Sequence, residues 1–121
     1  MKITVLLLIL WMGVASCVWD DEETLYPVPE SCDSLDVSYA MDVVPILANN
    51  CYSCHSNANA PDFAFGIALE DYTDVKSSSE LIVGAIKHSD GFPAMPRGAD
   101  QLDTCSISRI EAWVNDGSPD N

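Results

Sequence analysis

The sequence predicts a small all-α domain of about three to four helices. Apolar residues recur at helical spacing in two segments, residues 39–47 and 107–114. No stretch beyond the N-terminal segment alternates between apolar and polar residues for long enough to indicate a strand. A chain of 121 residues leaves room for one small domain, which buries only a modest core of its own.

The first predicted helix leads from Tyr39 toward residue 50. Tyr39, Val43 and Leu47 fall at i, i+4 and i+8, which places them on one helix face. Pro45 interrupts this pattern, because proline lacks a backbone N–H and clashes with the preceding turn. The helix is therefore either kinked at Pro45 or begins only near Asp42.

A second helix is predicted over the apolar run 81–86. Ser77-Ser78-Ser79-Glu80 matches a capping box in front of it. Residues 71–76 form a preceding helical turn or run continuously into this helix.

The last predicted helix covers residues 107–114. Gly117, followed by Pro119, is typical of a helix end. Glycines and prolines between residues 91 and 98 predict a structured loop without regular secondary structure between the second and last helices.

The composition is strongly acidic. Five Lys and Arg residues against nineteen Asp and Glu residues give a formal charge of −14, which excludes nucleic acid as an expected partner because phosphates would be repelled. The acidic side chains either form a solvated surface or steer the protein toward a basic patch on a partner protein.

Residues 1–16 have the pattern of an export signal. Lys2 precedes an apolar run, residues 3–12, that is too short for a transmembrane helix of about 20 residues. Val14-Ala15-Ser16-Cys17 resembles the lipobox of bacterial lipoproteins, in which the cysteine is lipidated and becomes the first residue after cleavage. The alternative is an ordinary secretory signal with an unrelated cysteine.

Residues 17–30 are acidic and contain two prolines, which predicts an extended, solvated tether. The expected organisation is a signal peptide over 1–16, a lipid-anchored tether over 17–30 and a folded domain over 31–121. This arrangement predicts an extracytoplasmic protein anchored to a bacterial membrane, on its periplasmic side or at the cell surface.

The most informative motif is Cys51-Tyr52-Ser53-Cys54-His55. Two thiols spaced by two residues can reach the two vinyl groups of one haem, and the adjacent histidine then lies under the iron as its proximal ligand. We therefore expect one haem c, attached through Cys51 and Cys54 and bound by His55.

Three other interpretations of the motif fit the sequence less well. A thioredoxin-type dithiol would need a preceding strand, and the sequence predicts none. A zinc site would need a second pair of ligands, whereas His88 and the other cysteines are scattered. A disulfide between Cys51 and Cys54 would leave His55 unexplained.

Each of the five cysteines has an expected role. Cys17 is the expected lipidation site, and Cys51 and Cys54 are expected to bind haem covalently. Cys32 and Cys105 remain, and in an exported protein they are expected to form a disulfide. It would close a loop of about 73 residues and stabilise the fold by about 4 kcal/mol in the chain-entropy model. The alternative is two buried free thiols.

The sixth iron ligand is assigned to Met95 by elimination. The other methionines lie in the signal peptide or, in the case of Met41, before the haem motif. Met95 is far enough along the chain from His55 to return on the opposite face of a haem, and Pro93 and Pro96 hold its turn. His88 is the competing candidate; otherwise it is a partly solvated residue beyond a helix end.

Together these residues resemble the small class I cytochrome c domains of bacterial lipoproteins over residues 31–121. The resemblance rests on Val44-Pro45-Ile46-Leu47, the haem motif, Gly91-Phe92-Pro93-Ala94-Met95-Pro96 and the segment 107–113. It implies a mostly helical fold, one haem with histidine and methionine ligands, and electron transfer rather than catalysis. Residues 56–61 depart from the usual glycine-rich stretch, so the carbonyl of Pro61 is the candidate acceptor for the ring N–H of His55.

The predicted function is therefore that of an anchored single-electron carrier that serves redox partner proteins. The alternatives are a haem enzyme or gas-binding protein with an open sixth position, and an electron-entry module of a larger complex.

Arg97 is expected to pair either with a haem propionate or with Asp100 or Asp103. The aromatic residues Phe63, Phe65 and Trp113 are expected in the core or haem wall rather than in an electron conduit.

Overall fold

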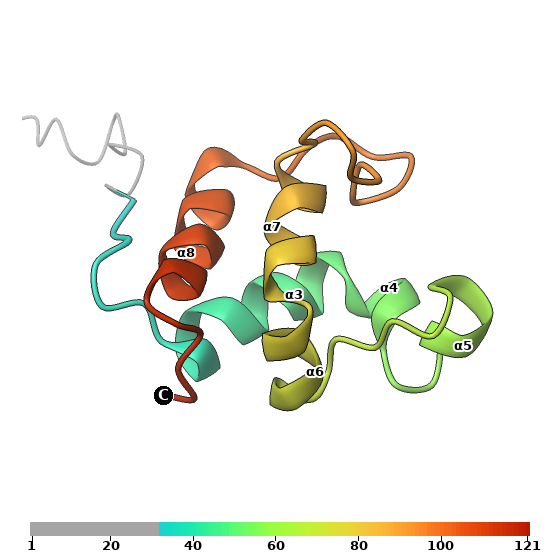
Figure 1. The fold of residues 1–121 in the computed structure, drawn as a ribbon, viewed down its shortest axis with the longest axis horizontal. Coiled ribbons are helices and arrows are strands. Elements are labelled where there is room, and N and C mark those ends of the chain that lie inside the picture. The colour runs from blue at the N-terminus through green and yellow to red at the C-terminus, as the bar shows by residue number, and fades with distance from the viewer. Residues whose placement is uncertain (1–31) are drawn as a thin grey trace, which may run out of the picture. The chain divides into compact units, whose positions relative to one another are not determined.

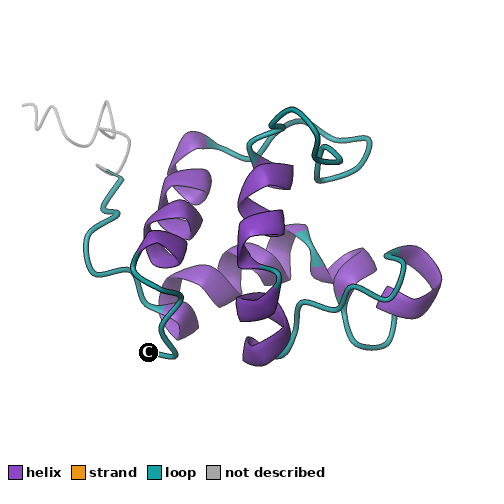
Figure 2. Ribbon diagram, viewed as in Figure 1, coloured by secondary structure: helices purple, strands orange, loops and turns teal. Residues whose placement is uncertain are grey.

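Helices joined by turns make up the fold of residues 32–121, the part of the chain that this computed structural model describes (Figures 1 and 2). No strand occurs in that range, which confirms the all-α prediction. The elements are, in chain order, η1 Tyr39–Val43, α3 Val44–Asn50, α4 Tyr52–His55, α5 Ala60–Phe63, α6 Tyr72–Ser77, α7 Ser79–Ile86 and α8 Thr104–Asn115.

The first helix is continuous through Pro45 and does not wait until Asp42 to begin. It opens with the π-helical turn η1, in which the N–H of Val43 donates to the carbonyl of Ser38 at 3.2 Å. The regular helix α3 follows, and Pro45 lies in its first turn, where the absence of an N–H costs little. The wider turn thus lets the helix start six residues before the proline without a clash.

Helices α6 and α7 meet at Ser78, and the predicted capping box is wrong. The N-cap of α7 is Ser78, and its side chain makes no capping hydrogen bond. Ser77, the first residue of the predicted box, is the last residue of α6, and its hydroxyl donates to the carbonyl of Asp74 at 2.9 Å. This hydroxyl therefore bonds within α6 and does not cap α7.

Helix α8 begins three residues before its predicted range, at Thr104, and ends before Gly117 as predicted. Asp103 caps its start, since its carboxylate accepts a hydrogen bond from the N–H of Ser106 at 2.9 Å. Beyond the last turn, Gly117 adopts the left-handed backbone conformation with φ of +90°. The N–H of Ser118 then donates to the carbonyl of Trp113 at 3.0 Å, which closes the helix end.

The core gathers where η1, α3, α7 and α8 pack together (Figure 1). Trp113 is 1% exposed, stacks on Tyr39 at 5.4 Å between ring centroids, and donates its indole N–H to the carbonyl of Pro119 at 2.8 Å. The hydroxyl of Tyr39 is buried and has no hydrogen-bond partner among the described residues, and burial is the main cause that raises the pKa of Tyr39 to about 12. Trp113 is thus a core residue, as expected.

A disulfide joins Cys32 to Cys105, the pair that the cysteine count predicted. Their Cα atoms lie 5.3 Å apart, and the bond links the first described residue to the first turn of α8. Nearby, the Arg109 side chain donates to the carbonyl of Asp33 at 3.1 Å. The segment that enters the domain is therefore held against α8 by two separate contacts.

All these helices belong to one unit of the chain, Ser31–Asn121. The predicted signal peptide 1–16, the tether 17–30 and the lipidation site Cys17 lie outside the described residues. Over residues 32–121, no helix has the length and apolar character needed to cross a membrane.

Candidate functional site

The Cys51 motif lies where α3 passes into α4. The N–H of Cys51 still donates to the carbonyl of Leu47 at 2.8 Å, and the N–H of His55 donates to the carbonyl of Cys51 at the same distance. Cys51, Cys54 and His55 are spaced i, i+3 and i+4 on this helical turn. Side chains at that spacing share one face of a helix, so all three can meet a single ligand.

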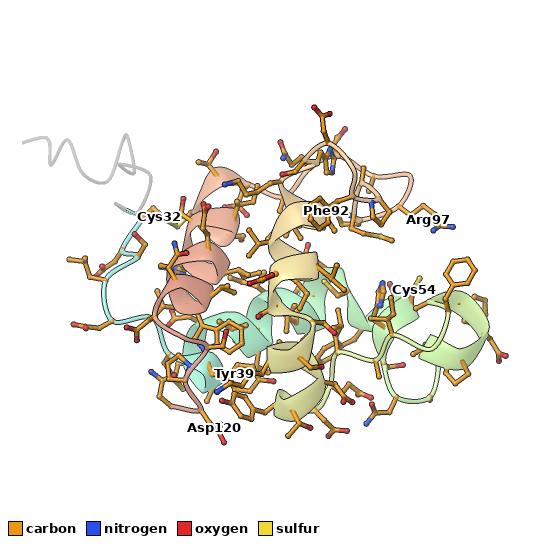
Figure 3. All side chains as sticks on the ribbon, viewed as in Figure 1. Cys32, Tyr39, Cys54, Phe92, Arg97 and Asp120 are labelled. Atoms are coloured by element: carbon orange, nitrogen blue, oxygen red, sulfur yellow. A yellow bond between two sulfur atoms is a disulfide. The ribbon has the colours of Figure 1, made fainter. Side chains whose placement is uncertain are left out.

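One cavity of about 520 Å³ brings the candidate site residues together. Cys51, Cys54 and His55 line it on the α4 side, and Met95 lines it from the loop that joins α7 to α8. Most of its other walls are apolar, and among them are Leu69, Ile82, Ala85, Ile86 and Leu102. In Figure 3, Cys54 on α4 faces the loop that carries Phe92 and Arg97.

The orientation of His55 is set by a residue that the sequence did not indicate. Its Nδ1 lies 2.8 Å from the carbonyl of Ile67, so Ile67, and not Pro61, accepts the ring N–H. The N–H of Leu69 returns a hydrogen bond to the carbonyl of His55, also at 2.8 Å. With Nδ1 as the donor, Nε2 carries the lone pair that can bind a metal.

The chain reaches Ile67 through a tight reversal after α5. Phe65 and Gly66 both have left-handed backbone conformations, with φ of +54° and +81°. The N–H of Gly66 donates to the carbonyl of Ala60 at 2.8 Å, which closes the turn. This reversal brings residues 67–69 back alongside α4, and Asn59 supports it by donating to the carbonyl of Ser53 at 2.9 Å.

Met95 is held in place by hydrogen bonds of its own backbone. Its N–H donates to the carbonyl of Ala85 in α7, and its carbonyl accepts from Nε2 of His88, both at 3.1 Å. His88 is exposed, lies just beyond α7 and is not among the residues that line the cavity. Of the two candidate sixth ligands, Met95 therefore lies at the cavity, and His88 fixes the loop that carries it.

Phe92 packs directly on the backbone of α7 at Gly84. A Cβ atom at Gly84 would lie 2.5 to 2.6 Å from three ring atoms of Phe92, much closer than side chains pack. Phe92 also lines the cavity, three residues before Met95. The absence of a side chain at Gly84 thus sets how closely the Met95 loop approaches α7.

The two cysteines of the motif differ in their surroundings. Cys54 is exposed, whereas Cys51 is partly enclosed, and burial raises the pKa of its thiol to about 11. In the protein without a cofactor, the Cys51 thiol is therefore protonated at neutral pH, and the Cys54 thiol is accessible to thiol-modifying reagents.

Arg97 pairs with neither Asp100 nor Asp103. The ion pairs found in residues 32–121 are Lys87 with Glu111 and Arg109 with Asp42, and Asp103 is engaged as the cap of α8. The guanidinium carbon of Arg97 instead lies 5.9 Å from the ring centroid of Phe65.

The zinc interpretation of the motif gains no ligand set. The described part of the chain contains no group of three or more His, Cys, Asp or Glu side chains that could hold a metal ion.

Comparison of the chain with protein-family models, curated proteins and solved structures found no match. The residues that line the cavity therefore carry the functional proposal.

Proposed function

We propose that residues 31–121 form a cytochrome c domain that binds one haem c and transfers single electrons outside the cytoplasm. The observation that carries the proposal is the meeting of Cys51, Cys54, His55 and Met95 at one apolar cavity. Haem supplies a reversible one-electron couple at its iron when it is bound.

The size and chemistry of the cavity suit such a group. Its volume of about 520 Å³ falls in the range of about 300–1,000 Å³ that is typical of ligand and cofactor pockets. Its apolar walls match a macrocycle, and its polar lining includes two thiols and an imidazole, with the thioether of Met95 near them. The other polar residues of the lining are Asn50, Ser53, Ser78 and Arg97. The described domain would also gain an interior that its own small core does not supply.

Each of the four residues has a distinct task in this proposal. The thiols of Cys51 and Cys54 would hold the haem covalently through its two vinyl groups. Nε2 of His55 would bind the iron, and the hydrogen bond from Nδ1–H to Ile67 fixes the ring and makes the nitrogen a better donor. The sulfur of Met95 would provide the second protein ligand.

Met95 distinguishes an electron carrier from the alternative of an open sixth position. A haem enzyme or gas-binding protein would need that position accessible to a small molecule. Here the backbone of Met95 is fixed to Ala85 and His88, which supports a ligand held in place during oxidation and reduction. An electron-entry module of a larger complex would have the same geometry and differ only in its partner.

The acidic composition of the chain supports a basic redox partner. Its formal net charge is −14, and the exposed apolar side chains that line the cavity include Phe63 and Leu81. An apolar patch on an acidic protein fits a partner with a basic docking patch, and their association should weaken with salt. The lipidated Cys17 would keep the carrier at the membrane.

Mass spectrometry of protein matured with a haem-attachment system tests this function. The peptide that contains Cys51 and Cys54 should carry the mass of one haem. Cys51→Ala with Cys54→Ala should abolish attachment, while Cys32→Ser with Cys105→Ser, the matched pair outside the cavity, should retain it in the molecules that fold. A matured wild-type peptide without added haem mass would refute the proposal.

A further inference from the structure

Two residues that face each other at the cavity come from the reversal that holds His55 and from the loop that carries Met95. Phe65 lies in the reversal after α5, and Arg97 lies in the loop between α7 and α8. Their side chains are in cation–π range, at 5.9 Å from the guanidinium carbon to the ring centroid. This is a direct side-chain contact between the two segments.

The backbone holds Phe65 in an unusual position. A left-handed conformation is uncommon for a bulky residue, yet Phe65 has φ of +54°. Phe65 is 85% exposed, so burial in a core does not explain the conformation. The reversal instead presents the ring at the cavity, where Arg97 contacts it.

Each partner of the contact is two positions from a residue that either holds a proposed iron ligand or is one. Phe65 precedes Ile67 by two positions, and the carbonyl of Ile67 holds the ring of His55. Arg97 follows Met95 by two positions. The contact thus connects the His55 side of the cavity to the Met95 side.

We infer that Phe65 and Arg97 form a latch that holds the Met95 loop against the His55 side and so keeps the Met95 sulfur on the haem iron. This inference rests on the proposed function, because it assigns the latch a role in haem ligation. Both are positioning residues: neither is proposed to bind the iron. When the latch opens, the loop is free to swing and an external ligand can replace Met95.

Imidazole competition on the oxidised, haem-loaded protein measures this opening. Imidazole replaces the methionine sulfur, and the weak near-infrared sulfur-to-iron band disappears as it binds. An exposed cation–π contact is weak, so removing it should raise the apparent imidazole affinity by about 2- to 5-fold. Phe65→Leu and Arg97→Gln should each show this rise, and the double variant should show no more than either alone.

Three controls separate the latch from general loosening of the cavity mouth. Arg97→Lys keeps a cation, so its imidazole affinity should be close to the low wild-type value. Phe65→Trp offers a better cation–π face and should lower it. Lys76→Gln removes another cation–π contact, that of Lys76 with the ring of Tyr72; neither residue lines the cavity, so it should leave the imidazole affinity unchanged.

The outcomes distinguish the latch from the function beneath it. Covalent haem with a sulfur band, together with unchanged imidazole affinity in Phe65→Leu and Arg97→Gln, would overturn the latch and leave the proposed function intact. Additive effects of the two variants would also overturn it. A chain that takes up no haem, or that lacks the sulfur band in the wild type, would overturn both.

Discussion

Gly84→Ala is expected to push Phe92 off helix α7 and loosen the Met95 loop. The new Cβ would lie 2.5 Å from one ring carbon of Phe92 and 2.6 Å from two others, one of which is the atom that attaches the ring. Rotation of the ring alone cannot relieve contacts with all three atoms. The whole side chain must shift, and the loop that contains Met95 must shift with it.

The net change in stability is the difference between two opposing effects. Alanine is favoured over glycine inside a helix by about 1 kcal/mol. Forcing an extra carbon into a packed site costs about 1–3 kcal/mol. With a clash cost near 2 kcal/mol, Gly84→Ala should lower the free energy of unfolding by about 1 kcal/mol.

A double-mutant cycle with Phe92→Ala isolates the clash. Without the ring, only the helical preference remains, so Gly84→Ala should then stabilise the protein by about 1 kcal/mol. The cycle needs the free energy of unfolding of four proteins: wild type, the two single variants and the double variant. Denaturant unfolding gives all four values when the proteins are measured in the same haem state. The same proteins should show that Gly84→Ala raises the imidazole affinity of the oxidised haem form, since the displaced loop holds Met95 less firmly.

The cycle can also refute this reasoning. If Gly84→Ala stabilises the otherwise wild-type protein as much as it stabilises Phe92→Ala, the ring does not lie against Gly84. In that case the packing of Phe92 on α7 would not position the Met95 loop.

Three further predictions concern stability and thiol chemistry. Asp103→Ala should lower the free energy of unfolding by about 1 kcal/mol, because it removes the cap of α8. The hydrogen bond from Ser106 lowers the pKa of Asp103, so the stabilisation by this carboxylate is complete above the ordinary value of 3.8 and is lost as pH falls through the lowered pKa. Unfolding curves measured across acid pH would show this loss. Tyr39→Phe should stabilise the protein by up to about 1 kcal/mol in thermal unfolding, since it removes a buried hydroxyl without a partner, and a loss of stability would indicate a hidden partner. In protein without haem at pH 8, iodoacetamide should modify Cys54 before Cys51, because a pKa of about 11 leaves Cys51 with about 100-fold less thiolate than an ordinary thiol; equal labelling rates would contradict the burial of Cys51.

The sequence predicted the features that depend on neighbours along the chain. Helix α8 was predictable because its apolar spacing and the glycine after it are local signals. The sequence also singled out Cys51, Cys54 and His55 as one motif, and the structure places the three on one helical turn. The pairing of Cys32 with Cys105 was predictable by counting, because every other cysteine had another predicted role.

Features that depend on tertiary contacts were missed. The acceptor for the His55 ring is Ile67 because Phe65 and Gly66 reverse the chain, and a left-handed conformation at a phenylalanine has no sequence signal. The capping box failed because Ser77 belongs to α6 and its hydroxyl bonds within that helix. The contact of Phe92 with Gly84 joins a loop to a helix and needed the folded chain to be seen.

The absorption spectrum of the matured, oxidised protein, measured for wild type, Met95→Ala and His88→Ala, tests the central claim most directly. The wild type should be six-coordinate and low-spin with a near-infrared sulfur-to-iron band. Met95→Ala should lose that band, and His88→Ala should keep it, because His88 holds the loop through the Met95 carbonyl and does not line the cavity. A high-spin wild type, or loss of the native ligand in His88→Ala but not in Met95→Ala, would contradict the account.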